Sequence, residues 1–581
     1  MLSDLKTRDS SSFSSWLIDA AGIFILLSIF YALWIGSHPL FTPDEGRYSE
    51  VAREMIATGD YITPRLNGVA FLDKPILYYW LQASAIKLFG LKESALRLWP
   101  ALIGILNCLF VYLAGRQLFN RRAAILAALC LATSPLYYGA AHYANLDLEV
   151  ASFISMTLLC FLMASQAKPG RLRTVLFLSV YVFASLASLT KGLIGIVLPG
   201  LVAGSWILLL NRWSLLKYAR LFSGLFIFAC ITVPWYVLAQ LNNPQFFHFF
   251  FVTQQFSRFL TMDKFNNQTA MWFYLPIVIA GFFPWAVFLP QAIFENLRNT
   301  WKNREAHSKE LFLLLWIFLI FIFFSIPRSK TIGYILPIFP GLALITANYI
   351  DIHWNDIKNW GIKFAMMIYT LFAIAICITC LTVPHLKSLS IDKHLTSYLM
   401  FSGILFLISG LSVFSLRHSF KKVIIILLIT ASLFSLTINA SCNALNQKTI
   451  KPLALYLKTV IQPNDQVITY YKYYQDLPIY LERRITIVAD WSASDIPQYD
   501  NWVRELWYGM PFQDTSGWLI YEKDFWQRWH GKQHLFVFMN KNYLENFQRK
   551  AHGKFYQLNQ FNDIILVSNQ PISEKSTISP R

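Results

Sequence analysis

The sequence predicts a multi-pass α-helical membrane protein with about 13 transmembrane helices, interfacial juxtamembrane helices and a small C-terminal α/β domain. Hydrophobic residues make up 55% of the 581-residue chain and charged residues only 14%, which excludes an ordinary soluble globular protein. Apolar runs long enough to cross a bilayer recur along most of the chain. After about Asn443 the composition changes to mixed aromatic, charged and short β-branched runs, which is typical of a folded domain outside the membrane.

Thirteen apolar segments can be drawn along the chain. The first, residues 16–36, has the position of a signal peptide, but it is long and lacks a small-x-small cleavage site. Because further spans follow it, we expect a retained helix. The other segments are approximately 94–115, 123–141, 148–165, 174–190, 193–210, 221–241, 272–294, 311–326, 334–350, 362–383, 397–416 and 423–441.

The distribution of basic residues predicts the orientation of the chain. The formal charge is +18, but Lys and Arg lie in short connections rather than in one stripe, which argues against nucleic acid and favours lipid headgroups. The basic connections alternate along the chain: 116–122, 168–173, 212–220, 298–309, 358–363 and 417–422. The positive-inside rule places them and the N-terminus in the cytoplasm. With an odd number of spans, the C-terminus then lies on the opposite side.

The C-terminal region combines one helical and several strand patterns. Lys451–Val460 is expected to be a helix, and Gln466–Tyr470 and residues 484–488 to be strands. We therefore expect a transmembrane catalytic domain over residues 1–442, with amphipathic helices in its outer loop 37–93, and a periplasmic α/β domain over residues 443–581. The second domain is expected to act as a scaffold or lid.

The vicinal pair Asp44-Glu45 directly follows the first span. Carboxylates lose hydration at the edge of a hydrocarbon core, so ionisable groups there indicate a functional site. Pro43 before two acidic residues predicts a helix start. Apolar residues at helical spacing from Tyr48 to Ile56 predict that this helix is amphipathic and lies in the interface. Capping of the helix is the alternative explanation, but one carboxylate is sufficient for a cap, so the pair favours a site.

Other connections on the same side carry further polar residues. Asp147 and Glu149 open a span, where they could either cap the helix or belong to a site. The cations on this side are Lys74, Lys191, Arg258, Arg328 and Lys330. Each could simply contact lipid headgroups or helix carbonyls. Together they favour a polyanionic lipid substrate, because charge-assisted contacts to phosphate oxygens are strong.

The ordered motifs of this chain resemble those of the polyprenyl-phosphate-dependent glycosyltransferases of GT-C fold. The motifs are Asp44-Glu-x-Arg47, Asp73-Lys74-Pro75, the Asp147 loop, Thr190-Lys-Gly192 and Ser329-Lys-x-x-x-Tyr334-x-Leu-Pro. Within this group, the likeness is closest to the bacterial transferases of 4-amino-4-deoxy-L-arabinose to lipid A, and it covers essentially the whole chain. This resemblance implies that the sugar is transferred from undecaprenyl phosphate to a lipid A phosphate at the periplasmic face of the inner membrane. Such modification confers resistance to polymyxin and other cationic antimicrobial peptides.

The same resemblance implies roles for individual residues. Asp44 matches the catalytic aspartate of the family, and Asp147 is the second catalytic candidate. Lys74, Arg258 and Tyr334 match ligands of the carrier phosphate. Further substrate-binding candidates are Glu45, Arg47, Asp73, Lys191 and Lys330. Asp73 departs from the glutamate expected in many relatives, and its shorter side chain changes the reach of the carboxylate but not its charge.

The chemistry implied by these roles is substitution at the sugar carbon with an anionic leaving group. Undecaprenyl phosphate is already a stabilised anion, so it needs cations more than a protonating acid. Asp44 would orient or deprotonate the acceptor and stabilise an oxocarbenium-like centre, with inversion expected. No cofactor is expected with certainty, and a divalent metal held by Asp44, Glu45 and Asp147 is left open. The chain is expected to be monomeric.

Three other functions remain as alternatives. A transferase of another polyprenyl-phosphate-linked sugar to lipid A, a glycan or a protein is the nearest, because protein O-mannosyltransferases share parts of the motif set. A transporter of anionic lipids would show inverted repeats and charges at the membrane midplane, whereas here the charges cluster at one edge. A lipid sensor would explain the cations but not the acidic residues.

Overall fold

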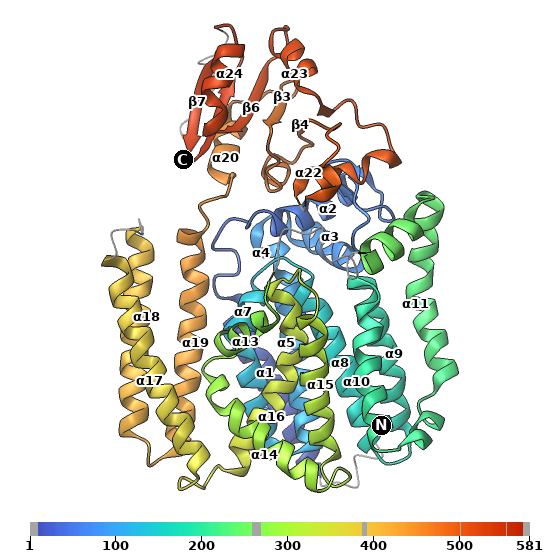
Figure 1. Ribbon diagram of the computed structural model, residues 1–581, viewed down its shortest axis with the longest axis vertical. Coiled ribbons are helices and arrows are strands. Elements are labelled where there is room, and N and C mark those ends of the chain that lie inside the picture. Colours follow the sequence, from blue (N-terminus) through green and yellow to red (C-terminus); the bar gives the residue numbers. More distant parts are fainter. Residues whose placement is uncertain (1–9, 258–268, 386–391, 500, 554, 573–581) are drawn as a thin grey trace. The chain divides into compact units, whose positions relative to one another are not determined.

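The computed structural model describes residues 10–257, 269–385, 392–499, 501–553 and 555–572, and Figure 1 shows their helices and strands. The chain divides into two compact units. Unit 1 comprises Met1–Ser37, Arg97–Tyr236 and Asn267–Leu445, and unit 2 comprises His38–Leu96, Val237–Asn266 and Asn446–Arg581. The outer loop after the first span therefore clusters with the C-terminal region. The sequence-based division into domains 1–442 and 443–581 stays a prediction.

Unit 1 is built from helices. Its α-helices are α1 (Ser10–Ala32), α5 (Leu98–Leu118), α6 (Arg121–Ala132), α7 (Pro135–Ala141), α8 (Asp147–Gln166), α9 (Arg171–Lys191), α10 (Ile194–Leu209), α11 (Leu221–Asn242, which runs on into unit 2), α13 (Tyr274–Gly281), α14 (Leu289–Lys302), α15 (Ser308–Ser325), α16 (Phe339–Ile352), α17 (Trp360–Thr382), α18 (Lys393–Ser415) and α19 (Phe420–Leu445). Short helical turns are η1 (Trp213–Lys217), η3 (Met271–Phe273), η4 (Trp285–Phe288), η5 (Ile332–Ile338) and η6 (Val383–His385).

Each of the thirteen expected apolar segments is helical in the structure. Among the described residues, ten helices are long and apolar enough to cross a membrane. Two further segments are pairs of helices bent at a short break: α6 with α7 by 64°, and Met271–Gly281 with Trp285–Lys302 by 111°. The thirteenth, α10, is a shorter apolar helix of 16 residues with Pro199 inside it. The chain is a multi-span membrane protein.

Helix α8 lies at the centre of unit 1, whereas α11 lies at its edge. α8 packs against α5, α9, α10 and η5, and 94% of its apolar window is buried inside the protein. Only 17% of the apolar window of α11 is buried inside the protein, so most of its apolar side chains are available to contact lipid. Small residues allow close packing in the interior; a Cβ atom on Gly115 of α5, for example, would come 3.0 Å from the Cα of Ala124 in α6.

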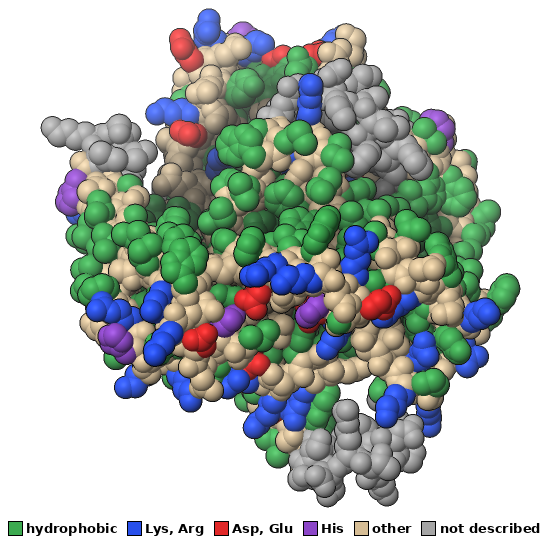
Figure 2. Space-filling model, turned by 60° about the horizontal axis from the view of Figure 1, so that its bottom comes forward, with side chains coloured by type: hydrophobic (Ala, Val, Ile, Leu, Met, Phe, Trp, Pro, Cys, Tyr) green, Lys and Arg blue, Asp and Glu red, His purple; other side chains and the backbone are tan. Residues whose placement is uncertain are grey.

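One end of unit 1 is rich in basic side chains. Figure 2 shows Lys and Arg gathered on this face next to a broad band of hydrophobic side chains. The connections that the sequence assigns to the cytoplasm contain the exposed cations Arg121, Arg122, Lys168, Arg171, Lys217, Arg220, Arg298, Lys302, Arg304, Lys358, Lys363, Arg417, Lys421 and Lys422. A basic rim beside an apolar band is typical of the cytoplasmic ends of membrane helices.

Unit 2 combines short helices with a mixed sheet. Its helices are α2 (Asp44–Thr58), α3 (Leu77–Phe89), α4 (Glu93–Leu96), η2 (His248–Ser257), α20 (Lys451–Val460), α21 (Leu477–Leu481), η7 (Ile496–Gln498), α22 (Trp502–Trp507), η8 (Met510–Phe512), α23 (Glu522–Trp529), η9 (Lys541–Tyr543) and α24 (Leu544–Lys550). Its strands are β1 (Arg65–Leu66), β2 (Val69–Ala70), β3 (Gln466–Tyr470), β4 (Thr486–Val488), β5 (Leu519–Ile520), β6 (Leu535–Asn540), β7 (Tyr556–Phe561) and β8 (Ile564–Ser568).

The sheet of unit 2 has the strand order β5-β4-β3-β6-β8-β7 (Figure 1). Strands β3, β4, β5 and β6 are parallel, and β8 and β7 are added in antiparallel pairing. The centre of the sheet is apolar on both faces, because every residue of β8 and the first five residues of β6 are buried. The helix expected at Lys451–Val460, the strand at Gln466–Tyr470 and the small α/β domain are thus confirmed.

Helix α2 begins at Asp44, where the sequence predicts a helix start. Its apolar residues are buried as expected, but the polar face is buried too, including Glu50 and Glu54. The simple amphipathic surface helix is therefore wrong. Arg53 explains the difference, since it donates two 2.7 Å hydrogen bonds to Glu50 and makes an ion pair with Glu54 at 3.5 Å. Paired in this way, charged side chains can be buried without leaving an isolated charge.

Candidate active site

The acidic start of α2 forms a three-residue charged cluster in unit 2. Arg47 pairs with Asp44 one turn before it on the same helix and also with Glu505 of α22. The side chains of Arg47 and Glu505 are 15% and 14% exposed, whereas that of Asp44 is 35% exposed. Asp44 is therefore the member of this cluster that a ligand can reach.

The electrostatics of this cluster follow from its burial. Burial alone would lower the pKa of the Arg47 guanidinium, but Glu505, Tyr48 and Asp44 outweigh it and hold that pKa well above its usual value. Asp73 contributes to the same effect. Arg47 is thus a fixed positive charge that orients the carboxylates around it.

The side chains that pack beside Arg47 are aromatic. Its guanidinium lies 4.9 Å from the centre of the Tyr48 ring, and Tyr48 packs against Tyr78 and Tyr79 of α3 at 5.8 and 6.2 Å. Tyr79 is fully buried, and its hydroxyl has no hydrogen-bond partner among the described residues. A buried hydroxyl group of this kind can serve a ligand or a water molecule.

The C-terminal part of unit 2 supports the loop that carries Asp44. Asn67 donates to the carbonyl of Ile485 and accepts from its amide, both at 2.8 Å. Gln513 accepts from Arg65 and donates to the carbonyl of Gly68. These bonds fix the β1–β2 turn of the loop to residues more than 400 positions further along the chain.

Glu505 is the residue that the sequence reasoning missed. It lies in a C-terminal region whose catalytic content could not be read, 458 residues from Arg47. No local motif marks it, since its only unusual property is its burial beside an arginine. An acidic residue in an aromatic stretch of sequence (Trp502-Val-Arg-Glu-Leu-Trp507) is the one signal that could have suggested it.

A second charged cluster lies in unit 1, where α8 begins and α9 ends. Asp147, the first residue of α8, forms an ion pair with Lys191, the last residue of α9. The Lys191 ammonium lies 4.0 Å from the centre of the Tyr334 ring, a cation–π distance. The side chains of Asp147 and Lys191 are 16% and 11% exposed.

Local backbone features hold this second cluster. Asn145 accepts a 3.0 Å hydrogen bond from the Asp147 amide, which fixes the start of α8. Gly192 follows Lys191 with φ +82°, a conformation that lets the chain turn sharply after α9. Gly333, next to Tyr334 in η5, lies so close to the Asp147 carboxylate that a Cβ atom would overlap with it.

The other candidate site residues differ in their burial and in their hydrogen-bond partners. Glu45 accepts a 2.8 Å hydrogen bond from the Phe41 amide and so closes the turn before α2. Asp73 and Lys74 follow β2 and are half-buried. Lys330 is buried, donates a 3.2 Å hydrogen bond to the Thr269 carbonyl, and has a lowered pKa because burial disfavours its charge.

The structure thus brings together Asp44, Arg47 and Asp73 in unit 2, and Asp147, Lys191 and Tyr334 in unit 1. Arg258 lies outside the described residues. Among the residues that are described, no group of three or more His, Cys, Asp or Glu side chains could hold a metal ion. The roles assigned to the candidate residues stay predictions.

Each cluster pairs a carboxylate with a cation at the end of a helix. In unit 2, a partly exposed carboxylate is held by a buried arginine, an arrangement suited to accepting a proton or a hydrogen bond. In unit 1, a lysine and a tyrosine lie at the end of a membrane span, an arrangement suited to an anionic headgroup.

Sequence comparison relates the chain to lipid-linked sugar transferases. The family described as dolichyl-phosphate-mannose-protein mannosyltransferase matches residues 73–237. An undecaprenyl phosphate-alpha-4-amino-4-deoxy-L-arabinose arabinosyl transferase of Aeromonas salmonicida is 32% identical over 367 residues, which cover 63% of this chain and 65% of that protein. A second transferase of this name, from Pseudomonas fluorescens, is 29% identical over 381 residues, covering 65% and 64%. The chain thus spans just under two thirds of these relatives.

The similarity to a solved structure covers more of the chain than the sequence matches do. The crystal structure of ArnT from Cupriavidus metallidurans bound to undecaprenyl phosphate matches with a TM-score of 0.82 and 25% identity, over 98% of this chain and 100% of that one. The expected fold class, a multi-pass helical membrane protein of GT-C type with a small C-terminal α/β domain, is confirmed. The resemblance to the aminoarabinose transferases, first suggested by the motifs, is confirmed as well.

Proposed function

We propose that this protein is a membrane glycosyltransferase that moves 4-amino-4-deoxy-L-arabinose from undecaprenyl phosphate to a phosphate of lipid A. The observation that carries the proposal is the structural likeness over nearly the whole chain to a protein crystallised with undecaprenyl phosphate. The two charged clusters support it, because both consist of residue types that bind or react with charged lipid substrates. The modified lipid A carries less negative charge, which lowers the affinity of polymyxin and other cationic peptides.

Asp44 is the proposed catalytic residue. It is the most exposed carboxylate of its cluster and is held by Arg47, so it can orient or deprotonate the acceptor while its own position is fixed. A lipid A phosphate is nucleophilic without strong base help, so Asp44 also has a role in binding the amine of the sugar. Asp147 is the second proposed catalytic residue, acting through its ion pair with Lys191.

The carrier phosphate is the proposed ligand of Lys74, Arg258 and Tyr334, with Lys191 beside Tyr334. The departing phosphate is a stabilised anion, so positive charge and hydrogen-bond donors are sufficient to assist it. Glu45, Asp73 and Lys330 are proposed to shape the substrate-binding region. The sugar is transferred with inversion, because a direct attack by the acceptor uses one displacement.

The proposed location is the bacterial inner membrane, with the N-terminus and the basic connections in the cytoplasm. The exposed Lys and Arg residues of these connections support this orientation. With thirteen spans, residues 443–581 form a periplasmic domain of a monomeric enzyme. Single cysteines placed in the loops at 168–173 and at Lys532 test the orientation, since a membrane-impermeant thiol reagent applied from outside should label only the second.

A second candidate is a transferase with a protein acceptor. The match of residues 73–237 to a protein mannosyltransferase family favours it specifically. Both candidates use a polyprenyl-phosphate donor, so they differ only in the sugar and the acceptor.

The decisive experiment is mass spectrometry of lipid A from cells with and without the gene. Loss of the aminoarabinose mass increment on deletion, and its return with the wild-type gene, would support the proposal. An unchanged lipid A profile would exclude it and shift attention to glycoproteins. Complementation with Asp44→Asn should leave the protein in the membrane at its normal level but restore no modification; near-normal modification would remove Asp44 from the catalytic role.

A further inference from the structure

Helix α14 differs in composition from the spans of unit 1. The polar residues among its 14 positions are Gln291, Glu295, Asn296, Arg298, Asn299, Thr300 and Lys302. The chain bends by 111° between Met271–Gly281 and Trp285–Lys302, the segment that contains α14. Figure 1 shows α14 at the lower end of unit 1, where it leads into the basic connection 298–309. A helix with so many polar groups is suited to the membrane interface rather than to the hydrocarbon core.

One face of α14 packs against the protein. Ala292, Asn296 and Thr300 recur every four residues and are buried, and the helix contacts η4, α15 and α16. The single acidic side chain of α14, Glu295, bonds to the Nε2 atom of His353 at 2.9 Å. These contacts fix the rotation of α14 about its axis, so the opposite face points out of the protein.

This opposite face carries a stripe of large apolar side chains. Phe294, Leu297 and Trp301 follow one another at spacings of three and four residues and are 69%, 46% and 83% exposed. Tryptophan is enriched where the hydrocarbon of a membrane meets its polar headgroups. The stripe is therefore suited to contact the upper part of lipid acyl chains.

Two cations lie on one side of this stripe. Arg298 and Lys302 are both exposed, and they directly follow Leu297 and Trp301 in the sequence. Each is rotated by about 100° from the residue before it, so both lie on the same side of the stripe. Four residues correspond to about 6 Å along the helix axis, which allows both side chains to reach one phosphate group.

The charge of this pair is not neutralised by a carboxylate of the protein. Arg121, at the same end of unit 1, pairs with Asp19 at 2.7 Å. Neither Arg298 nor Lys302 makes an ion pair within the part of the chain that the structure describes. Two unpaired cations at one turn's spacing are available to an anion from outside the protein.

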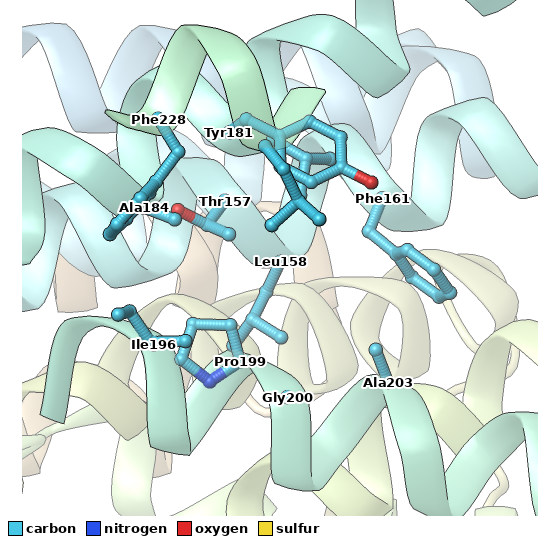
Figure 3. Close-up of a pocket in the computed structure, with 12 residues that line it drawn as sticks. Thr157, Leu158, Phe161, Tyr181, Ala184, Ile196, Pro199, Gly200, Ala203 and Phe228 are labelled. Atoms are coloured by element: carbon cyan, nitrogen blue, oxygen red, sulfur yellow. The ribbon is translucent and has the colours of Figure 1, made fainter. Parts of the chain in front are cut away.

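A second apolar surface of unit 1 lacks such charges. It is a pocket of about 260 Å³ lined by residues of α8, α9, α10 and α11 (Figure 3). Its polar lining residues are Thr157 and Tyr181, whose hydroxyl groups donate to backbone carbonyls at 2.8 and 2.9 Å. The pocket thus offers apolar contacts alone, whereas the exposed side of α14 combines an apolar stripe with two cations.

We propose that the exposed face of α14, formed by Phe294, Leu297, Arg298, Trp301 and Lys302, binds an anionic phospholipid. The headgroup phosphate lies between the two cations, and the acyl chains contact the apolar stripe. A zwitterionic phospholipid carries an ammonium group that the cations repel, so a headgroup with net negative charge binds more tightly. In the proposed orientation of the chain this lipid belongs to the cytoplasmic leaflet. Its binding requires neither the donor nor the acceptor of the proposed reaction.

The test compares two double substitutions that remove the same charge. Arg298→Gln with Lys302→Gln removes both cations from the exposed face of α14. Lys421→Gln with Lys422→Gln is the control, because these exposed lysines lie at the start of α19 and make no ion pair with a described residue. Consecutive residues of a helix point about 100° apart, so the control lysines do not form a pair on one face. Both double variants should have the wild-type Tm without added lipid, because all four side chains are exposed.

Binding is measured by native mass spectrometry of the purified protein with phosphatidylglycerol and with phosphatidylcholine of the same acyl chains. The wild type should bind phosphatidylglycerol about 10-fold or more tightly, since each Lys or Arg near an anionic lipid contributes roughly a factor of five. The preference should fall to about twofold in the α14 double variant and persist in the control. Trp301→Ala should weaken the binding of both lipids to a similar extent, because it removes apolar contact but no charge.

A photoreactive phosphatidylglycerol locates the site. The labelled peptide should contain α14 in the wild type and in the control, and the label should be lost in the α14 double variant. An equal lipid preference of the two double variants would overturn the proposal, and so would the absence of label on α14 in the wild type. Labelling of α14 by a photoreactive phosphatidylcholine that phosphatidylglycerol does not displace would overturn it as well. If deletion of the gene leaves lipid A unchanged but this binding pattern is found, the lipid site stands and the proposed reaction does not.

Discussion

The two charged clusters are built in opposite ways. In unit 2, Asp44 and Arg47 are three residues apart on one helix, and the pair is completed by Glu505 from a distant part of the chain. In unit 1, Asp147 and Lys191 are 44 residues apart and meet because one span begins where another ends. The first cluster leaves its carboxylate 35% exposed, and the second leaves Asp147 only 16% exposed. The difference in exposure fits the proposed roles, proton transfer for the first cluster and charge neutralisation for the second.

After the loss expected for Asp44→Asn, the largest effect is expected from removing Lys191, the cation of the unit 1 cluster. Lys191→Met should lower kcat for sugar transfer about 100-fold, because one electrostatic contact to a developing anion is commonly worth 10²–10³ in rate. The measurement is a steady-state assay with the lipid-linked donor. Lys191→Arg retains the charge and should recover part of the rate. If Lys191→Met keeps more than half of the wild-type rate, the second cluster does not neutralise the leaving group.

The next effect tests the packing that holds Asp147 in place. Gly333→Ala should reduce activity about 10-fold, since its Cβ atom would displace the Asp147 carboxylate from Lys191. Gly139→Ala in α7 is the matched control, because a Cβ atom there meets nothing within 4 Å. Equal activity of the two variants would show that the exact position of Asp147 is unimportant.

A smaller effect is expected from Glu505, which acts on Asp44 through Arg47. Glu505→Gln should lower kcat about 5-fold to 10-fold, with little change in KM, because Arg47 loses its ion pair with the carboxylate of α22. Glu505→Asp should restore part of the loss. Glu545→Gln, at an exposed position in α24, serves as the control for a change of charge. A rise in KM with unchanged kcat would instead indicate that Glu505 helps to bind substrate.

The smallest effect concerns the stability of unit 2 and its buried acid Asp476. Burial raises the pKa of this carboxyl from 3.8 to about 7, even though the Ile450 amide and the Thr449 hydroxyl donate hydrogen bonds to it. The folded protein therefore keeps the proton to higher pH than the unfolded chain. This favours folding below about pH 4, and the benefit is lost as the pH rises towards 7.

Asp476→Asn removes this titration without changing the size of the side chain. The Tm of the variant should rise relative to that of the wild type between about pH 5 and pH 7, and the difference should stay constant above about pH 8. Thermal unfolding of the purified protein in detergent at several pH values gives the measurement. A Tm difference that does not vary with pH would show that Asp476 does not titrate in this range.

Much of the fold could be read from the sequence, because each apolar segment must supply a span and each span must satisfy its own backbone. The start of α2 at Asp44 was predicted from Pro43 and the acidic residues, and the helix at Lys451–Val460 from its apolar spacing. The burial of the polar face of α2 was not predicted, because it depends on Arg53 and on elements far along the chain. The pairing of Asp147 with Lys191 was not predicted either, although both had been named as candidates.

The sequence by itself determined that the chain spans a membrane, that its polar residues concentrate at the edges of the spans, and which of them are candidates for a site. These properties follow from local composition, since a helix in lipid needs an apolar surface of fixed length. Only the tertiary structure decided that Glu505 completes the Asp44 cluster, that Gly333 makes room for Asp147, and that α8–α11 enclose an apolar pocket. These features arise from contacts between residues that are distant in the chain, and the spacing of residues in a sequence carries no record of such contacts.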